Sequence, residues 1–372
     1  MDKEIQMSNV PKLTADKVVD YMSAAFASLC INNLPFSSLP PIILWGPPGV
    51  GKSQAVHKVA DEVSRKTGKK TKVIDVRLLL FNPIDLRGIP VANEKKDAAV
   101  WLKPAIFNMD DSDDVINFLF LDEITAAPPS VQAAAYQITL DRTIGEHKLP
   151  GNCIIVAAGN RTTDKSVAYK MPKALANRLM HVEISTSFDA WRKWAVEKGI
   201  NKKVLGFLSF RQDYLLAFDS NSDDVAFATP RSWEMASNVL NNVSDDVSVM
   251  YPFLAGILGT GVASELSSWT KVYDQLPSIS DIFEGKRPKM PTGSDALYAL
   301  ISSMTVYARE HKDDMEKIIN SIEYAMDLPA DFSAVLIKDY MYLENGYKER
   351  LFHVPEFTKW LRVHGGRLNG IV

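Results

Sequence analysis

The stretch PIILWGPPGVGKSQAVHKVA, residues 41–60, decides the fold because an apolar run, a glycine-rich turn and an amphipathic segment follow one another without interruption. Four residues satisfy the pattern Gly-x4-Gly-Lys-Ser/Thr: Gly46, Gly51, Lys52 and Ser53. After a strand and before a helix, this pattern predicts a loop whose backbone N–H groups surround phosphate. The helix N-terminus adds partial positive charge. A Gly/Pro-rich turn without a ligand is the alternative.

A second signal is VINFLFLDEI, residues 115–124, a buried-strand run that ends in Asp122 and Glu123. Ligands of parallel sheets bind where the strands end, so both carboxylates are expected beside the phosphate loop. We expect Asp122 to hold the hydration shell of Mg²⁺ and Glu123 to orient and deprotonate an attacking water. An acidic turn that only ends the strand is the alternative for this motif alone.

The two signals together predict a site for ATP and Mg²⁺. Lys52 is expected to reach the β- and γ-phosphates, and the hydroxyl of Ser53 is expected to bind the metal together with Asp122. The residues expected to hold the nucleotide are Gly46, Pro48, Gly49, Val50, Gly51, Lys52, Ser53 and Asp122.

A third polar end follows the apolar run 153–158, within RTIGEHKLPGNCIIVAAGNR, residues 142–161. Asn160 is expected at the same rim of the sheet, where a neutral amide can hydrogen-bond the γ-phosphate or the attacking water. An asparagine that only caps the next turn is the alternative. Residues 143–149, with the turn Pro150-Gly151-Asn152 after them, predict a hairpin arm that folds back onto 153–158.

Glu146, His147 and Cys153 raise the alternative of a metal site in this stretch. Glu146 and His147 are adjacent, so on a strand they would point to opposite faces. None of the six histidines forms a pair at the short spacing of local zinc motifs. The sequence therefore disfavours a structural metal. The two cysteines, Cys30 and Cys153, are expected as buried free thiols in a reducing compartment.

Composition fits a globular protein of two or three domains, since 372 residues exceed what one core usually organises. The balance of 42 Lys+Arg against 45 Asp+Glu gives a net charge of −3, which argues against binding nucleic acid through bulk charge. The polar N-terminal sequence lacks the apolar core of a signal peptide, so we expect a cytoplasmic location. The uncharged run 247–264 contains Pro252 and three glycines, which favours a buried helix pair over a membrane span.

The order of apolar runs predicts an α/β fold with a parallel five-stranded sheet, followed by helices only. The expected strands are 42–45, 72–76, 115–121, 153–158 and 181–184, and an amphipathic helix is expected over 54–65. The segment EGKRPKMPTGSD, residues 284–295, is expected to connect helical units. The predicted domains are an α/β nucleotide-binding domain over 1–186, an all-α lid domain over 187–285 and a helical extension over 286–372.

Five motifs in order, GPPGVGKS, FLFLDEI, AAGN, ALANRL and TPRSWE, resemble those of the AAA+ ATPases, a class of P-loop NTPases, and most closely its MoxR branch. The resemblance covers about residues 35–280 and implies that Asn160 is the sensor 1 residue and Arg231 the sensor 2 residue. It also implies that Arg178 is the arginine finger offered to a neighbouring subunit. Relatives usually have Phe after the finger, where this chain has Leu179. Arg161 and Arg142 are the other candidates for a contact in trans.

The resemblance further implies a ring, expected to be a hexamer, because each site is completed by a neighbour. The hairpin over 143–149 resembles the pre-sensor insertion of this branch, and residues 82–107 resemble the insertion that faces the ring pore. There Arg87, Gly88 and Trp101 could touch a substrate, although a plain surface excursion is an equal alternative.

Our hypothesis from the sequence is a MoxR-type AAA+ ATPase that uses Mg-ATP hydrolysis to remodel or mature a protein partner. Relatives act beside proteins with a von Willebrand factor A domain, so such a partner is expected. A nucleic-acid motor is one alternative, with Lys286, Arg287 and Lys289 as phosphate contacts. A nucleotide-gated scaffold with little turnover is another, and the presence of Glu123 and Asn160 argues against it.

Overall fold

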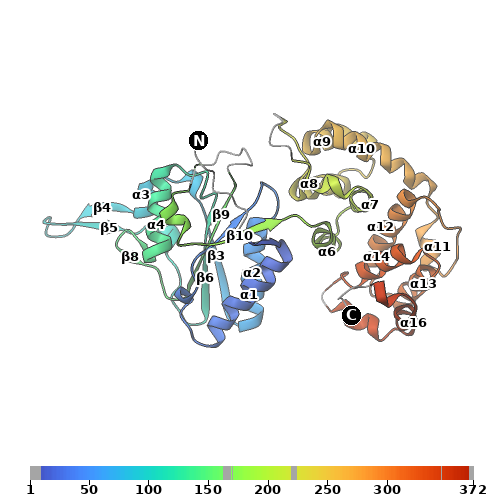
Figure 1. Ribbon diagram of the computed structural model, residues 1–372, viewed down its shortest axis with the longest axis horizontal. Coiled ribbons are helices and arrows are strands. Elements are labelled where there is room, and N and C mark those ends of the chain that lie inside the picture. The colour runs from blue at the N-terminus through green and yellow to red at the C-terminus, as the bar shows by residue number, and fades with distance from the viewer. Residues whose placement is uncertain (1–9, 162–168, 170, 219–223, 345, 368–372) are drawn as a thin grey trace. The chain divides into compact units, whose positions relative to one another are not determined.

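The computed structural model describes residues 10–161, 169, 171–218, 224–344 and 346–367 (Figure 1). The chain divides into two compact units, Met1–Thr186 and Ser187–Val372. The finer division of the second unit into a lid and an extension stays a prediction.

The first unit contains a six-stranded parallel sheet with the strand order β1-β10-β2-β9-β6-β3. Its strands are β1 (Lys12–Thr14), β2 (Ile42–Trp45), β3 (Lys70–Arg77), β6 (Val115–Asp122), β9 (Cys153–Gly159) and β10 (Met180–Ser185). The five predicted strands are all present, but the predicted number was wrong, because β1 adds a sixth strand beside β10. The sequence of β1 reads only Lys-Leu-Thr, which is too short and too polar to give a strand signal.

The sheet order brings three strand ends to one edge. Strand β9 lies between β2 and β6, with Trp45 opposite Gly159 and Leu121 opposite Ala157. All three strands run in the same direction, so the residues that follow them emerge side by side. This register places the glycine-rich loop, the acidic turn and Asn160 at a common rim.

Helices cover both faces of the sheet (Figure 1). Helices α1 (Ala15–Ile31) and α2 (Lys52–Thr67) pack together on one face, while α3 (Pro83–Arg87) and α4 (Pro129–Asp141) lie on the other. Helix α2 contains the predicted segment 54–65, and Val56, Val59 and Val63 are fully buried along one side, as its periodicity predicts. Burial of this side fixes the helix that begins at the phosphate loop.

Two short hairpins occur in the connections on the α4 side of the sheet. The first hairpin is formed by β4 (Ile89–Ala92) and β5 (Ala99–Leu102) and projects away from the sheet (Figure 1). It lies within the predicted pore-facing insertion and is called the arm below. The second hairpin, β7 (Thr143–Ile144) with β8 (His147–Lys148), confirms the predicted turn structure. Its strands pair with each other, whereas β9 pairs with β2 and β6, so the prediction that the hairpin folds back onto 153–158 was wrong. A 2.8 Å contact joins His147 Nε2 to the backbone oxygen of Trp101, which links the hairpin to the arm.

The second unit is helical throughout its described residues, apart from one isolated bridge between Ala217 and Ala228. Its α-helices are α6 (Phe188–Lys198), α7 (Lys202–Phe210), α8 (Pro230–Asn242), α9 (Val247–Leu258), α10 (Thr260–Thr270), α11 (Ile279–Phe283), α12 (Ser294–Glu310), α13 (Met315–Ala325), α14 (Ala330–Tyr340), α15 (Tyr347–Phe352) and α16 (Pro355–His364). One hydrophobic cluster extends from Trp191 to Trp360, so the predicted lid and extension share a core. The uncharged run forms the helix pair α9 and α10, as predicted. Within the described residues, no helix has the length and apolar character needed to cross a membrane.

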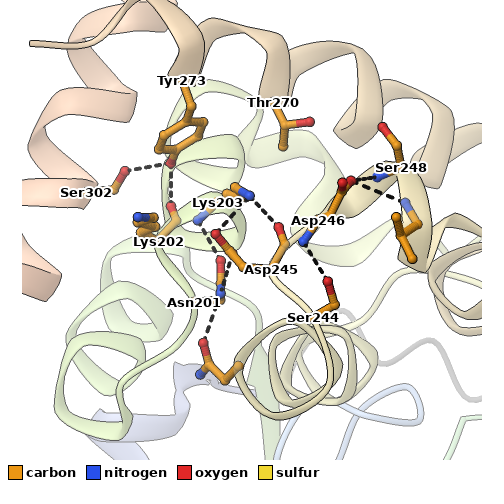
Figure 2. Close-up of polar contacts among 12 residues, drawn as sticks. Asn201, Lys202, Lys203, Ser244, Asp245, Asp246, Ser248, Thr270, Tyr273 and Ser302 are labelled. Carbon is orange, nitrogen blue, oxygen red and sulfur yellow. Dashed lines mark hydrogen bonds and ion pairs between the residues drawn. The ribbon is translucent and has the colours of Figure 1, made fainter.

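A polar network connects the start of α7, the α8–α9 turn and α12 (Figure 2). The hydroxyl of Tyr273 donates to the backbone oxygen of Lys202 at 2.8 Å and lies 3.2 Å from Ser302 Oγ. Asn201 donates to Asp245 at 3.2 Å. Burial raises the pKa of Tyr273 well above its usual value, so this hydroxyl remains a neutral donor.

A buried ion pair crosses the core of the second unit. Arg192 on α6 donates to both carboxylate oxygens of Asp339 on α14, at 2.8 and 2.6 Å. Thr305 on α12 donates to the same carboxylate at 2.8 Å. Arg192 and Asp339 are only 6% and 2% exposed. A bidentate pair at such depth strongly couples three helices, because either charge alone would be buried without compensation.

We predict that Asp339→Ala destabilises the helical unit by about 3–5 kcal/mol, since it leaves the Arg192 guanidinium buried without its partner. The measurement is the urea-induced unfolding of this unit. Asp313→Ala is the matched control, because Asp313 pairs with Arg350 at the surface, with 82% of its side chain exposed, and such pairs contribute about 0–1 kcal/mol. Equal effects of the two substitutions would contradict the role of the buried pair.

Candidate functional site

Lys52 lies at the centre of the glycine-rich loop. Its ammonium group donates to the backbone oxygens of Gly46 and Pro47, at 2.7 and 3.0 Å, and to Asn160 Oδ1 at 2.8 Å. The loop has this shape because Gly46, Gly49 and Gly51 all have a positive φ, a backbone conformation that residues with a Cβ rarely adopt. The contact between Lys52 and Asn160 joins the segments that follow β2 and β9. The sequence predicts the common rim but not this contact.

Ser53 and Asp122 form the second contact of the rim. The Ser53 hydroxyl donates to Asp122 Oδ2 at 3.0 Å, while Asp122 Oδ1 accepts the backbone N–H of Glu123 at 2.8 Å. A hydroxyl and a carboxylate side by side are hard oxygen donors of the kind that Mg²⁺ prefers. The donor set therefore fits the predicted metal, with the remaining positions left for water and phosphate oxygens.

Glu123 occupies a sharp turn directly after β6. Its φ of +55° lies in the left-handed region, which is uncommon for a residue with a side chain. The next residue fixes this turn to β9, because the backbone N–H of Ile124 donates to the backbone oxygen of Ala158 at 3.0 Å. Such constrained backbone is concentrated at functional sites. The assignment of Glu123 as the base stays a prediction.

Thr125 is a residue of the site that sequence reasoning missed. Its hydroxyl accepts a hydrogen bond from the backbone N–H of Asn160 at 3.0 Å and donates to the backbone oxygen of Asn160 at 3.1 Å. Thr125 is 2% exposed. A Cβ on Gly159 would lie only 2.9 Å from its side chain, so the approach requires glycine there. The available signal was a polar β-branched residue directly after the apolar Ile124, in the order Glu-Ile-Thr.

The charge of Asp122 affects a neighbouring strand. On β3, the pKa of Asp75 is raised by its partial burial and then by the nearby Asp122 carboxylate. A divalent cation at Asp122 would reduce this repulsion. Arg77 on the same strand opposes the increase, so charges of both signs lie on the β3 side of the rim.

The four candidate arginines have different surroundings. Arg161 pairs with the buried Glu183 at 2.8 Å, and Arg142 donates to the backbone oxygen of Cys153. Arg178 is exposed after α5 (Lys173–Ala176), where it donates to Ala174 O at 3.4 Å. Arg231 is exposed in the first turn of α8, in the second unit.

The residues of the metal alternative do not converge. Cys153 is fully buried in β9, and burial raises the pKa of its thiol to about 12, so it stays protonated and is a poor metal ligand. His147 contacts the oxygen of Trp101, and Glu146 is exposed. In the part of the chain that the structure describes, no three His, Cys, Asp or Glu side chains group to hold a metal.

Sequence comparison finds a family match within the first unit. Residues 41–181 match the family described as "ATPase family associated with various cellular activities (AAA)". This span starts before the phosphate loop and ends after Arg178, so it contains all the predicted site residues of the first unit. No curated protein sequence matches the chain.

Solved structures similar to the chain are distant. A putative ATPase from Cytophaga hutchinsonii has 17% identity and a TM-score of 0.33, over 65% of this chain and 66% of that one. PCH-2 of C. elegans has 16% identity and a TM-score of 0.34, over 70% and 68%. A mutant of Thermotoga maritima RuvB has 16% identity and a TM-score of 0.35, over 80% and 84%. TM-scores of this size say nothing about substrate or partner.

The parallel sheet, the glycine-rich loop and the acidic turn define a P-loop nucleotide hydrolase. Within that class, residues 41–181 match the family of AAA ATPases, and ATP hydrolysis is the activity that this match supports for the domain. The roles of the individual residues remain predictions.

We predict that Thr125→Val lowers kcat about ten-fold, because it removes the hydroxyl that positions Asn160 and leaves two backbone groups unpaired. ATP affinity should change less than about two-fold, since the phosphate loop keeps its own contacts. Thr125→Ser is the control and should retain most of the activity. Steady-state ATPase kinetics give both quantities, and an unchanged kcat in Thr125→Val would contradict this role.

Proposed function

We propose that the protein is a MoxR-type AAA+ ATPase, which uses Mg-ATP hydrolysis in a ring to remodel or mature a protein partner. The observation that carries the proposal is the meeting of four polar side chains at one rim. Lys52 lies 2.8 Å from Asn160, and Ser53 lies 3.0 Å from Asp122. A structural turn would not need a lysine, a serine, a carboxylate and an amide in contact.

Each group has a defined part in the proposed reaction. The backbone N–H groups of the loop and Lys52 hold the phosphates, so that the γ-phosphoryl group faces Asn160. Magnesium, held by Ser53 with Asp122, would neutralise phosphate charge. Glu123 would accept a proton from the attacking water, and Asn160 would orient that water or the γ-phosphate. Arg231 would contact the nucleotide from the helical unit.

The choice of arginine finger rests on availability. Arg161 has a buried carboxylate partner, and Arg142 donates to the oxygen of the buried Cys153. Arg178 is exposed, and its contact with the Ala174 oxygen is long, at 3.4 Å. We therefore assign Arg178 to the neighbouring subunit's site, where it would stabilise charge developing on the phosphoryl group. Such a contact requires a ring, and a hexamer is the expected form.

A protein client is supported by the arm and its surroundings. Leu80, Ile84, Ile89 and Leu102 are all more than half exposed in this region. Ile89 and Leu102 belong to the hairpin, and Leu80 and Ile84 belong to the segment before it. Exposed apolar side chains of this kind are a frequent feature of protein-binding surfaces. The expected partner carries a von Willebrand factor A domain. A cytoplasmic location is part of the same proposal and agrees with the free thiols of Cys30 and Cys153.

The nucleic-acid alternative loses support from local charge pairing. Lys286 pairs with Asp281 and Glu284, and Arg287 pairs with Glu323 and Asp327. Two of the three basic side chains proposed as phosphate contacts thus face carboxylates. Stimulation of ATPase activity by DNA, lost at high salt, would restore this alternative.

We predict that Glu123→Gln retains ATP binding and lowers kcat by roughly 10²-fold or more, because it removes the general base but keeps the phosphate loop. Lys52→Ala is the contrasting variant, whose ATP affinity should fall about ten- to a hundredfold through loss of charged hydrogen bonds. Titration with a fluorescent ATP analogue and steady-state kinetics separate the two. Hydrolysis by Glu123→Gln at the unmodified rate would refute the assignment of Glu123 as the base. It would also support the alternative of a nucleotide-gated scaffold with little turnover.

We also predict that mixing two inactive variants restores activity if Arg178 acts in trans. Arg178→Ala subunits keep an intact nucleotide site, and Lys52→Ala subunits keep an intact finger. Mixed rings should therefore hydrolyse ATP where a Lys52→Ala finger faces an Arg178→Ala site. No recovery in rings shown by native mass spectrometry to be mixed would count against the assignment.

A further inference from the structure

A continuous chain of hydrogen bonds starts at the residue before the phosphate loop and links Trp45, His181 and Ala176. The indole N–H of Trp45 donates to His181 Nδ1 at 2.9 Å, and His181 Nε2 lies 2.7 Å from the Ala176 oxygen. The two ring planes are nearly parallel, at 6° to each other, which is compatible with an N–H···N hydrogen bond between the rings. Trp45 is 7% exposed. The predicted site did not include these residues.

The partners fix the protonation state of the histidine. An indole N–H can only donate, so Nδ1 must be an unprotonated acceptor. A backbone oxygen can only accept, so Nε2 must carry the proton. Only the neutral Nε2–H tautomer satisfies both contacts, whereas a purely packing role would place no such demand on the ring.

The ends of this chain are attached to two functional segments. Trp45 is the last residue of β2, and Gly46 of the phosphate loop follows it directly. Ala176 ends α5, and Arg178 N–H donates to the oxygen of Leu175 in the same turn, at 2.9 Å. Leu175 and Leu179, on either side of Arg178, are buried in the same hydrophobic cluster as Trp45.

We propose that His181 is a positioning residue, which fixes Arg178 relative to the phosphate loop of its own subunit and so sets the finger for the next subunit's site. The proposal rests on the proposed function, in which Arg178 acts in trans. The hydrogen bonds carry the link, because the histidine ring contacts Trp45, which directly precedes the phosphate loop, and the backbone of Ala176, two residues before Arg178. Loss of His181 should therefore harm the neighbour's hydrolysis and spare nucleotide binding in its own subunit.

The experiment compares His181→Phe, which keeps an aromatic ring without hydrogen bonds, with His181→Gln, whose amide offers one acceptor and one donor. We expect His181→Phe to lower kcat roughly ten-fold, as for one lost hydrogen bond, with the affinity for a fluorescent ADP analogue unchanged. His181→Gln should regain most of the activity. Trp45→Phe breaks the chain at its other end and should resemble His181→Phe, which guards against a folding defect peculiar to one variant.

Mixed rings separate an effect on the finger from an effect on the variant's own site. His181→Phe subunits should recover activity with Lys52→Ala subunits, which supply a sound finger, but not with Arg178→Ala subunits, which supply none. Recovery with Arg178→Ala would overturn the proposal, as would an unchanged kcat in His181→Phe or a kcat in His181→Gln as low as in His181→Phe. Full activity of Arg178→Ala alone would refute the finger itself, and this inference with it. Loss of activity in Arg178→Ala but not in His181→Phe would overturn only the role of His181.

Discussion

The position of β9 between β2 and β6 is the constraint on which the rest of the site depends. Parallel pairing aligns Trp45 with Gly159 and Ala157 with Leu121, so the residues after each strand emerge at one level. The 2.8 Å contact between Lys52 and Asn160 is a direct consequence of this register. A shift of one residue in β9 would exchange its two faces and move Asn160 away from the loop.

Small residues at the end of β9 make the close approach possible. Ala157, Ala158 and Gly159 are fully or almost fully enclosed, and the turn after β6 packs against them. The oxygen of Ala158 accepts the N–H of Ile124, and the side chain of Thr125 lies against Gly159. A larger side chain at these positions would separate the acidic turn from Asn160, and the amide and the carboxylates would no longer lie at one rim.

The parts of the fold that could be predicted are those with a local signal. The apolar residues of 42–45 and the glycines of the loop after them are local signals. They were sufficient to predict the strand, the loop and the helix from a single stretch. Strand β1 could not be predicted, because its three residues become a strand only by pairing with β10, far along the chain. The β7–β8 hairpin was predicted, but its expected contact with 153–158 was wrong, since pairing within a hairpin and pairing with the sheet give the same local pattern.

The candidate site divides in the same way. The common position of Lys52, Asp122 and Asn160 could be predicted, because each belongs to a loop or turn at the carboxyl end of an apolar strand. Thr125 and His181 could not, since their importance comes from contacts with residues distant in sequence. The histidine also has no spacing relation to the loop, although the sheet places it beside Trp45. Residues that support a site through tertiary hydrogen bonds leave little trace in sequence patterns.

The most direct test of the account is an experimental structure of the Glu123→Gln protein with ATP and Mg²⁺. The account predicts that Mg²⁺ lies between Ser53 and Asp122, that the γ-phosphate lies within hydrogen-bond distance of Lys52 and Asn160, and that Arg178 of the neighbouring subunit faces that phosphate. Nucleotide bound away from this rim, or a closed ring with a different arginine at the γ-phosphate, would contradict it.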